Sequence, residues 1–247
     1  FKKKKQPKKK KKYKNLNKIS VLVMAGGKGQ RLKPLSNILP KPLIPIKNEP
    51  IINMIIKEFQ NYKIKNFVLS INNQLEIIKT YLKSNYKKLS ISYIFENKPL
   101  GTIGSLSLIK KISQDFFVTN CDTIIKYDYN KIYNYHKSNK NIITLVCSDI
   151  ETTSPYGECV TNSENKLINI IEKPKRKLLA MTGLYIFNKK IIKYIPTNKK
   201  MDMNILLLRL IKLGLNIGVY KLNSESWIDI GNWEKYKQVS ENNKIDK

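Results

Sequence analysis

Apolar residues in this sequence gather in short runs, and stretches with helical periodicity separate these runs. The runs predict strands at Ile19–Ala25, Asn66–Ile71, Ile91–Phe95, Asp115–Asn120 and Ile142–Ser148. The stretches between them predict helices at Ile51–Tyr62, Gln74–Lys83, Gly101–Lys111 and Tyr129–Ser138. Apolar strands that alternate with helices are typical of a largely parallel sheet covered on both faces. We therefore predict an α/β fold, a Rossmann-like three-layer α/β/α sandwich with a mostly parallel mixed sheet.

The pattern changes after Asp149, where the predicted strands become shorter. These strands lie at Glu158–Thr161, Leu167–Glu172, Met181–Phe187 and Ile217–Leu222. Helices are predicted near Lys189–Tyr194, at Met203–Leu213 and from Asn232 onward. We expect this region to complete the same sheet and to add a lid.

Composition modifies this picture mainly at the beginning of the chain. The net charge is +29, and ten lysines without any acid lie in residues 1–14, which leaves +19 for the rest. Because like charges repel, we predict that residues 1–17 form a disordered tail or an interdomain linker, and that residues 18–247 form one domain. Binding of polyanions by this tail stays open. Only three arginines occur, so we expect no specific nucleic acid partner.

The absence of targeting signals and the arrangement of the cysteines bear on the cellular compartment of the protein. The sequence has no run of eighteen apolar residues and no apolar stretch after Phe1, so we expect no membrane span and a cytoplasmic protein. The non-Met start suggests a beginning inside a longer polypeptide. Cys121, Cys147 and Cys159 lack metal-ligand spacing and are expected to be buried thiols. The single histidine, His136, is expected on the surface of a polar helix.

A glycine-rich loop follows the first predicted strand. The segment Met24–Leu32 contains Gly26, Gly27 and Gly29, three of only ten glycines in the chain. Such a loop at the carboxyl end of a parallel strand lets backbone N–H groups approach phosphate oxygens. It lacks the Gly-Lys-Ser/Thr ending of a Walker loop, and four prolines between residues 34 and 45 forbid the immediate helix of a dinucleotide fingerprint. Arg31 and Lys41 must therefore supply the positive charge.

Two aspartates follow predicted strands. Asp122 comes after the strand that ends at Asn120, and Asp229 precedes Gly231 in Trp227–Gly231. Either one alone could be a helix cap or a turn residue. Together with the loop, they could hold a divalent cation, because magnesium prefers one or two carboxylates with water and phosphate.

Taken together, these motifs resemble the sugar-1-phosphate nucleotidyltransferase family, whose signature is Gly-Gly-x-Gly-Thr-Arg-Leu followed by Pro-Lys-Pro-Leu. Gln30 replaces the usual Thr, and the resemblance covers roughly residues 19–236. It implies the nucleotide-diphospho-sugar transferase fold and a magnesium cofactor held by Asp122 and Asp229. The catalytic residues that it implies are Arg31, Lys41 and Asp122. The nucleotide-binding residues that it implies are Ala25, Gly26, Gly27, Gly29, Gln30, Arg31, Gly101 and Thr102.

The resemblance also assigns a sugar side. It implies that Tyr156, Gly157, Glu172, Lys173 and Thr182 bind the sugar phosphate, although a turn or an exposed ion pair stays open for the first four. On this basis residues 18–149 form the nucleotide-binding half and residues 150–247 the sugar-phosphate-binding half.

The implied reaction joins an NTP and a sugar 1-phosphate to give an NDP-sugar and pyrophosphate. Ser226–Gly231 and Asn120–Asp122 look most like the branch of mannose-1-phosphate or glucosamine-1-phosphate guanylyltransferases. That branch is often joined to an upstream pair of CBS regulatory domains. Assembly into a homo-oligomer is a further possibility that the resemblance leaves open. The alternatives are a thymidylyl-, uridylyl- or cytidylyltransferase, or a catalytically silent subunit that binds nucleotide sugars.

Overall fold

A seven-stranded sheet forms the centre of the computed structural model, which describes residues 16–27, 29–72 and 75–241. Its strand order is β12-β8-β11-β6-β1-β4-β5. The strands are β1 (Ser20–Met24), β4 (Asn66–Ile71), β5 (Ser90–Phe95), β6 (Asp115–Asn120), β8 (Ile143–Thr153), β11 (Lys175–Asn188) and β12 (Ile217–Leu222). All neighbours pair in parallel except β11, which is antiparallel to β6 and β8. The predicted mostly parallel mixed sheet is confirmed.

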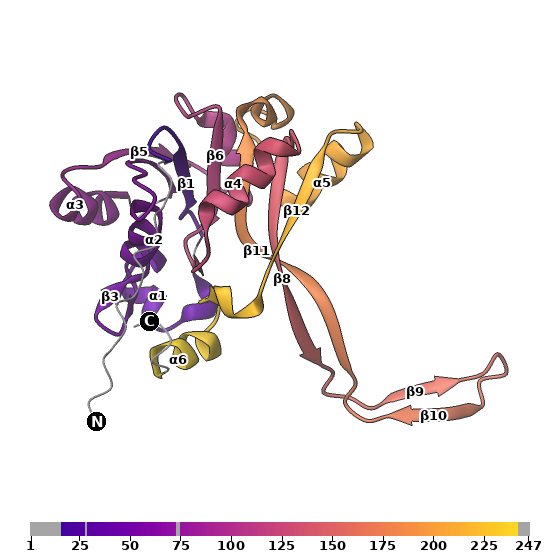
Figure 1. Cartoon of the computed structure of the whole chain (residues 1–247). Helices are drawn as coiled ribbons and strands as arrows, with labels where there is room; N and C mark the ends of the chain where they lie inside the picture. The colour runs from indigo at the N-terminus through magenta and orange to yellow at the C-terminus, as the bar shows by residue number, and fades with distance from the viewer. Residues whose placement is uncertain (1–15, 28, 73–74, 242–247) are drawn as a thin grey trace, which may run out of the picture.

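Helices cover both faces of this sheet (Figure 1). They are α1 (Leu35–Ile38), α2 (Ile51–Gln60), α3 (Leu75–Asn85), α4 (Tyr129–Ser138), α5 (Met203–Lys212) and α6 (Trp233–Glu241). Val21 and Val23 of β1 pack in one core with α2, α3 and α4, whereas Leu22 packs in a second core with α5. This alternation follows from the two-residue period of a strand and makes three layers. Within the described residues, no helix is long and apolar enough to cross a membrane.

Short strands and 3-10 turns complete the fold. The strand pairs are β2 (Pro45–Ile46) with β3 (Glu49–Pro50), β7 (Thr123–Ile125) with β13 (Trp227–Asp229), and β9 (Glu158–Thr161) with β10 (Leu167–Ile171). The 3-10 helices are Gln30–Leu32, Lys41–Leu43, Gly104–Leu108, Lys189–Tyr194 and Ser224–Ser226. The prolines after Arg31 thus limit the helices there to one turn, as predicted.

β8 and β11 continue beyond the sheet as a two-stranded ribbon that leads into the β9–β10 arm. The arm extends away from the sheet (Figure 1), so the expected lid does not cover the body in this structure. The predicted division after residue 149 falls inside β8, which runs unbroken from Ile143 to Thr153. The predicted tail, residues 1–17, lies outside the described residues except for Leu16 and Asn17, and Leu16 is buried in the core.

The predicted helix at Gly101–Lys111 is wrong. Only the 3-10 helix Gly104–Leu108 forms there. Gly101 adopts a left-handed φ of 77°, and the backbone N–H of Ile103 donates to the carbonyl of Met201 at 3.1 Å instead of joining an α-helical ladder. A contact with a distant segment therefore replaces the local hydrogen bonds that a helix would have used.

The predicted surface position of His136 is also wrong, because only 1% of this residue is exposed. It shares the inward face of α4 with Tyr129 and Ile132, at the spacing of a helical stripe. Its Nδ1 lies 2.8 Å from the hydroxyl of Thr144. Of the three thiols, Cys121 and Cys147 are buried as expected, whereas Cys159 is exposed on β9.

A buried carboxylate joins α4 to β6 and β11. Asp115 is 3% exposed and accepts hydrogen bonds from Lys137 Nζ at 2.8 Å and Asn188 Nδ2 at 2.7 Å, with His136 Nε2 at 3.6 Å. Burial by itself would raise the pKa of Asp115, but the contact with His136, the hydrogen bonds from Lys137 and Asn188 and the charge of Lys137 hold it well below its ordinary value. The ionised form is therefore part of the folded state.

We predict that Asp115→Asn lowers the free energy of unfolding at about pH 7 by roughly 1–3 kcal/mol, because the donors around this buried side chain lose their charged partner. A depressed folded-state pKa stabilises the fold above the unfolded-state value of about 3.9, and this contribution is lost as the pH falls below that value. Urea unfolding at about pH 7 and about pH 3 measures both effects.

The difference between Asp115→Asn and the wild-type chain should thus shrink in acid. Asp149→Asn, at an exposed ion pair with Lys221, is the matched control and should change little at either pH. An equal loss for both variants would contradict the role of the buried network.

Candidate functional site

The glycine loop leaves β1 at the carboxyl edge of the sheet, between β4 and β6. The N–H of Ala25 donates to the carbonyl of Ser70 at 2.8 Å, which extends the pairing of β1 with β4 by one residue. A Cβ on Gly26 would lie 2.8 Å from Oε1 of Glu96. Only glycine lets the backbone lie this close to that carboxylate.

A cavity of about 870 Å³ opens beside this loop. The predicted residues that line it are Gly26, Gly27, Gly29, Gln30, Arg31, Lys41, Gly101, Thr102 and Asp122. Unpredicted lining residues include Met24, Asn72, Glu96, Leu100, Asn120, Cys121 and Gly231. Ala25 is buried beneath the loop rather than in the lining. The structure therefore gathers most of the predicted nucleotide side around one space, which is large enough for a nucleotide-sized ligand.

The two predicted metal ligands lie on neighbouring elements. Asp229 in β13 pairs with Thr123 in β7, and the N–H of Ile230 donates to the carbonyl of Asp122 at 2.9 Å. A Cβ on Gly231 would lie 2.8 Å from Asp229 Oδ1, 3.6 Å from Asp122 Oδ2 and 3.7 Å from Arg31 Nη2. Both carboxylates and the guanidinium therefore converge on Gly231 at the wall of the cavity.

Each of these carboxylates has a lysine partner. Lys41 pairs with Asp122, and Lys235 of α6 pairs with Asp229. Lys235 is not recognisable from the sequence, because helix periodicity alone does not tell which side of α6 faces Gly231. Neighbouring carboxylates repel each other, and the two ammonium groups offset that repulsion.

The donor set can be tested against a metal. In the described ranges, no group of three or more His, Cys, Asp or Glu side chains could hold an ion. Asp122 and Asp229 together meet the requirement of magnesium, which keeps water and phosphate oxygens in its other positions. Burial raises the pKa of the neighbouring Cys121 thiol to about 12, which favours the protonated form.

Glu96 is the main residue that sequence reasoning missed. It is buried, and it accepts hydrogen bonds from Ser70 Oγ at 2.5 Å and from the N–H of Leu100 at 3.2 Å. It follows β5 directly, so its place at the carboxyl end of a parallel strand was a usable signal. The structure thus places an acceptor-only group in the cavity, under Gly26.

The side chain of Thr102, a predicted nucleotide-binding residue, is engaged within the protein. Its hydroxyl accepts a hydrogen bond from the N–H of Met203 at 2.7 Å, and its own N–H donates to Asp202 Oδ1 at 2.9 Å. Thr102 also separates the main cavity from a second one of about 380 Å³. Residues lining the second cavity are Met24, Thr102, Val118, Asn120, Met181, Tyr185, Asp202, Met203 and Asn204.

The predicted sugar-phosphate residues are not gathered at the main cavity. Tyr156, Gly157, Glu172 and Lys173 lie where the ribbon joins the β9–β10 arm, and Tyr156 is 76% exposed. Glu172 packs on Gly157, whose Cβ position lies 3.1 Å from its Oε2. Thr182 is buried and lines neither cavity, although its neighbour Met181 lines the second one, and its hydroxyl donates to the carbonyl of Val146 at 2.9 Å.

Comparison with known proteins gives consistent matches. A family model described as Nucleotidyl transferase matches residues 20–245. Mannose-1-phosphate guanyltransferase of Saccharomyces cerevisiae is 32% identical over 224 residues, which cover 85% of this chain and 60% of that protein. UTP–glucose-1-phosphate uridylyltransferase of Synechocystis sp. is 28% identical over 242 residues, covering 90% of this chain and 62% of that protein. The chain thus spans about three fifths of the length of these relatives.

Solved structures agree with the fold. The crystal structure of HddC from Yersinia pseudotuberculosis has a TM-score of 0.69 and 27% identity, and covers 90% of this chain and 98% of that chain. HddC has also been solved in complex with GMP-PN. Together with the strand order, this likeness confirms the fold class that the sequence predicted.

Adjacent glycines provide a test of the packing under the loop. We predict that Gly26→Ala lowers the free energy of unfolding by about 1–3 kcal/mol, because its Cβ would displace the buried Glu96 carboxylate. Gly27→Ala is the matched control, since a Cβ there meets nothing within 4 Å, and its change should stay within about 1 kcal/mol. Denaturant unfolding of both variants makes the comparison, and equal stabilities would show that the loop does not rest on Glu96.

Proposed function

This chain belongs to the nucleotidyl transferase family, and on that premise we propose that it transfers a nucleotidyl group from an NTP to a sugar 1-phosphate and releases pyrophosphate. The observation that carries this proposal is the convergence of Asp122, Asp229 and Arg31 on Gly231, beside the glycine loop. A phosphate-binding loop with positive charge and two carboxylates suits phosphoryl chemistry on a nucleotide.

The nucleophile in this reaction is a phosphate oxygen of the sugar 1-phosphate, and it attacks the α-phosphorus in line. Its second pKa of about 6 leaves it mostly dianionic at neutral pH, so it needs no general base. The cavity lining among the described residues accordingly contains no histidine. The work left to the protein is alignment of the two substrates and neutralisation of their charge.

Arg31 and Lys41 provide that neutralisation. The planar guanidinium of Arg31 suits bidentate contact with phosphate oxygens, and Lys41 can turn from Asp122 to an incoming phosphate. Mg²⁺ held by Asp122 and Asp229 would supply further positive charge to the triphosphate. Lys41 lines the main cavity, so its positive charge offsets Asp122 in the free protein and would be available to the substrate phosphates.

The sugar side rests on two groups of residues. The second cavity adjoins the main one through Met24, Thr102 and Asn120, and it is the nearest space for a sugar ring. Tyr156, Gly157, Glu172, Lys173 and Thr182 stay proposed sugar-phosphate residues; the arm would have to approach the cavities before the first four could contact a ligand. The halves 18–149 and 150–247 then share both cavities.

A guanine base suits Glu96 best. A carboxylate can only accept hydrogen bonds, and guanine offers two adjacent donors, N1–H and N2–H, on its Watson–Crick edge. Uracil and thymine present one donor between two acceptors, which would face a carboxylate unfavourably. The guanyltransferase of Saccharomyces cerevisiae and the GMP-PN complex of HddC point in the same direction.

We predict that Asp122→Asn lowers the rate of pyrophosphate release by about 10²- to 10³-fold or more, because one of two converging carboxylates loses its charge. Pyrophosphate release is measured with a panel of NTPs crossed with hexose 1-phosphates. Asp128→Asn, which keeps a capping side chain on α4, is the control and should retain full activity.

Thermal unfolding checks that both aspartate variants are folded. Near-normal turnover by folded Asp122→Asn would refute the assignment of this site. A wild-type chain that binds nucleotide but releases no pyrophosphate with any pair would instead favour a catalytically silent binding subunit.

We predict that Glu96→Gln lowers kcat/KM for GTP by about 10- to 100-fold, because an amide replaces one acceptor with a donor. The same change should raise the relative use of UTP or dTTP, since an amide offers both a donor and an acceptor to their base edge. Steady-state kinetics with a panel of NTPs measures kcat/KM for GTP relative to UTP and dTTP. An unchanged order of preference would show that Glu96 does not contact the base.

A further inference from the structure

Two segments about a hundred residues apart interlock between the cavities. The N–H of Met201 donates to the carbonyl of Leu100 at 2.9 Å, and the N–H of Ile103 donates to the carbonyl of Met201 at 3.1 Å. A Cβ on Gly101 would lie 2.6 Å from both Asp202 Oδ1 and the Met201 carbonyl oxygen. The loop after Glu96 therefore has its shape because the chain before α5 packs directly on it.

Side chains are exchanged across this junction. Asp202 is the N-cap residue of α5, yet its carboxylate makes no capping bond to its own helix. The hydroxyl of Thr102 caps α5 instead, at Met203 N, while Asp202 Oδ1 accepts the N–H of Thr102. Within the described ranges, Asp202 Oδ2 has no hydrogen-bond donor from the protein. Thr102 therefore satisfies one of the free N–H groups at the start of α5, and the side chain of Asp202 satisfies none of them.

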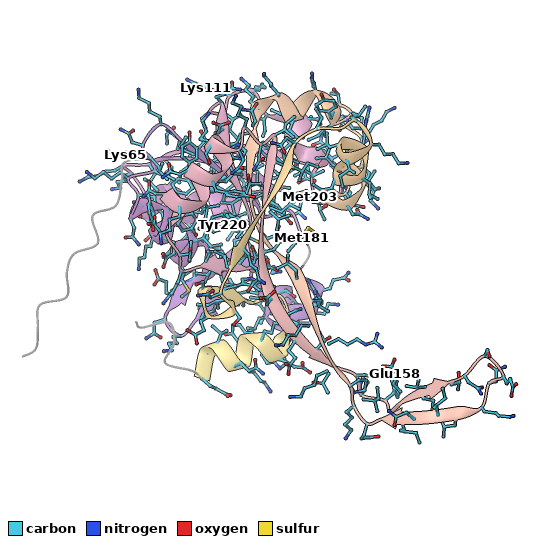
Figure 2. The ribbon with its side chains drawn as sticks, turned by 45° about the vertical axis from the view of Figure 1, so that its right-hand side comes forward. Lys65, Lys111, Glu158, Met181, Met203 and Tyr220 are labelled. Carbon is cyan, nitrogen blue, oxygen red and sulfur yellow. The ribbon has the colours of Figure 1, made fainter. Side chains whose placement is uncertain are left out.

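The free oxygen belongs to a side chain that lines the second cavity. Met181 and Met203 lie close to each other there (Figure 2), and Met24 and Val118 add further apolar lining. Asp202 is the only acidic residue among the described residues that line this cavity. Asp202 is half-buried, so its second oxygen is an acceptor that a ligand in this cavity can reach.

We propose that Asp202 selects the acceptor sugar, with Oδ2 accepting a hydrogen bond from one ring hydroxyl of the sugar 1-phosphate while Oδ1 holds the N–H of Thr102. This inference rests on the proposed function and deepens it, because it names a specificity-determining residue in the second cavity. The same carboxylate then joins the sugar to the loop that lines the nucleotide cavity. A site built to bind a hydroxyl discriminates strongly against sugars that lack it.

Asp202→Asn is the most direct variant. Its amide oxygen keeps an acceptor for the N–H of Thr102, and its amide nitrogen replaces the free acceptor with a donor. We predict that KM for the sugar 1-phosphate rises about 10- to 100-fold, whereas KM for the NTP changes less than about 2-fold. Asp149→Asn, an exposed aspartate outside both cavities, is the matched control and should leave both constants unchanged.

A series of monodeoxy sugar 1-phosphates identifies the hydroxyl. In the wild-type chain, removal of one particular hydroxyl should lower kcat/KM by about 10²-fold or more, and in Asp202→Asn that loss should shrink to about 3-fold or less. Losses at the other positions should be the same in both proteins. A generally loosened cavity would instead weaken all positions together, and that outcome would overturn the proposal.

The outcomes separate this inference from the proposed function. If folded Asp202→Asn turns over with an unchanged KM and with the same losses for each deoxy sugar, the proposed role of Asp202 is refuted. The proposed nucleotidyl transfer is then unaffected. If the wild-type chain turns over no combination of NTP and sugar 1-phosphate, the proposed function fails. Calorimetric binding of the same sugar 1-phosphates to wild type and to Asp202→Asn then tests the role of Asp202 in sugar binding. Should the Asn variant unfold, Asp202→Glu keeps the charge but moves both oxygens, and the selectivity for the same hydroxyl should fall; retained selectivity refutes the proposal.

Discussion

Parallel pairing of β1 with β4 on one side and β6 on the other is the constraint on which the rest of this structure depends. Met24 pairs with Ser70 in β4 and with Asn120 in β6, so all three strands end at the same edge. The glycine loop, Glu96 and Asp122 all leave the sheet there, although they are far apart in the sequence. The cavity is therefore a consequence of strand direction and register.

Opposite charges are paired at this edge of the sheet. Two carboxylates converge on Gly231 in a chain with a net charge of +29, and each has a lysine partner. The Lys235–Asp229 pair is partly open to water and costs little to exchange, whereas the Lys41–Asp122 pair is nearly buried and needs a replacement partner when it separates. A site that keeps carboxylates and positive charges within reach of one another can accept a highly charged ligand without large rearrangement of the backbone.

Sequence patterns predicted the sheet, the glycine loop and the strand-end position of Asp122 well, because these depend on local periodicity and on the ends of strands. They failed at Gly101–Lys111, where backbone bonds to Met201 replace a helix, and at His136, whose stripe with Ile132 was overlooked. Glu96 was missed since a single acidic residue in a polar turn looks ordinary. Its burial under Gly26 is visible only when the loop and β5 are placed together.

By itself, the sequence determined the α/β class, the order of its elements and the chemical types available at the strand ends, because each follows from residues close together in the chain. The tertiary structure decided which distant groups meet. It brought Asp229 to Asp122 through β13 and β7, and it let Thr102 cap α5 so that one oxygen of Asp202 stays free. Such contacts join residues about a hundred positions apart, and no local periodicity encodes them.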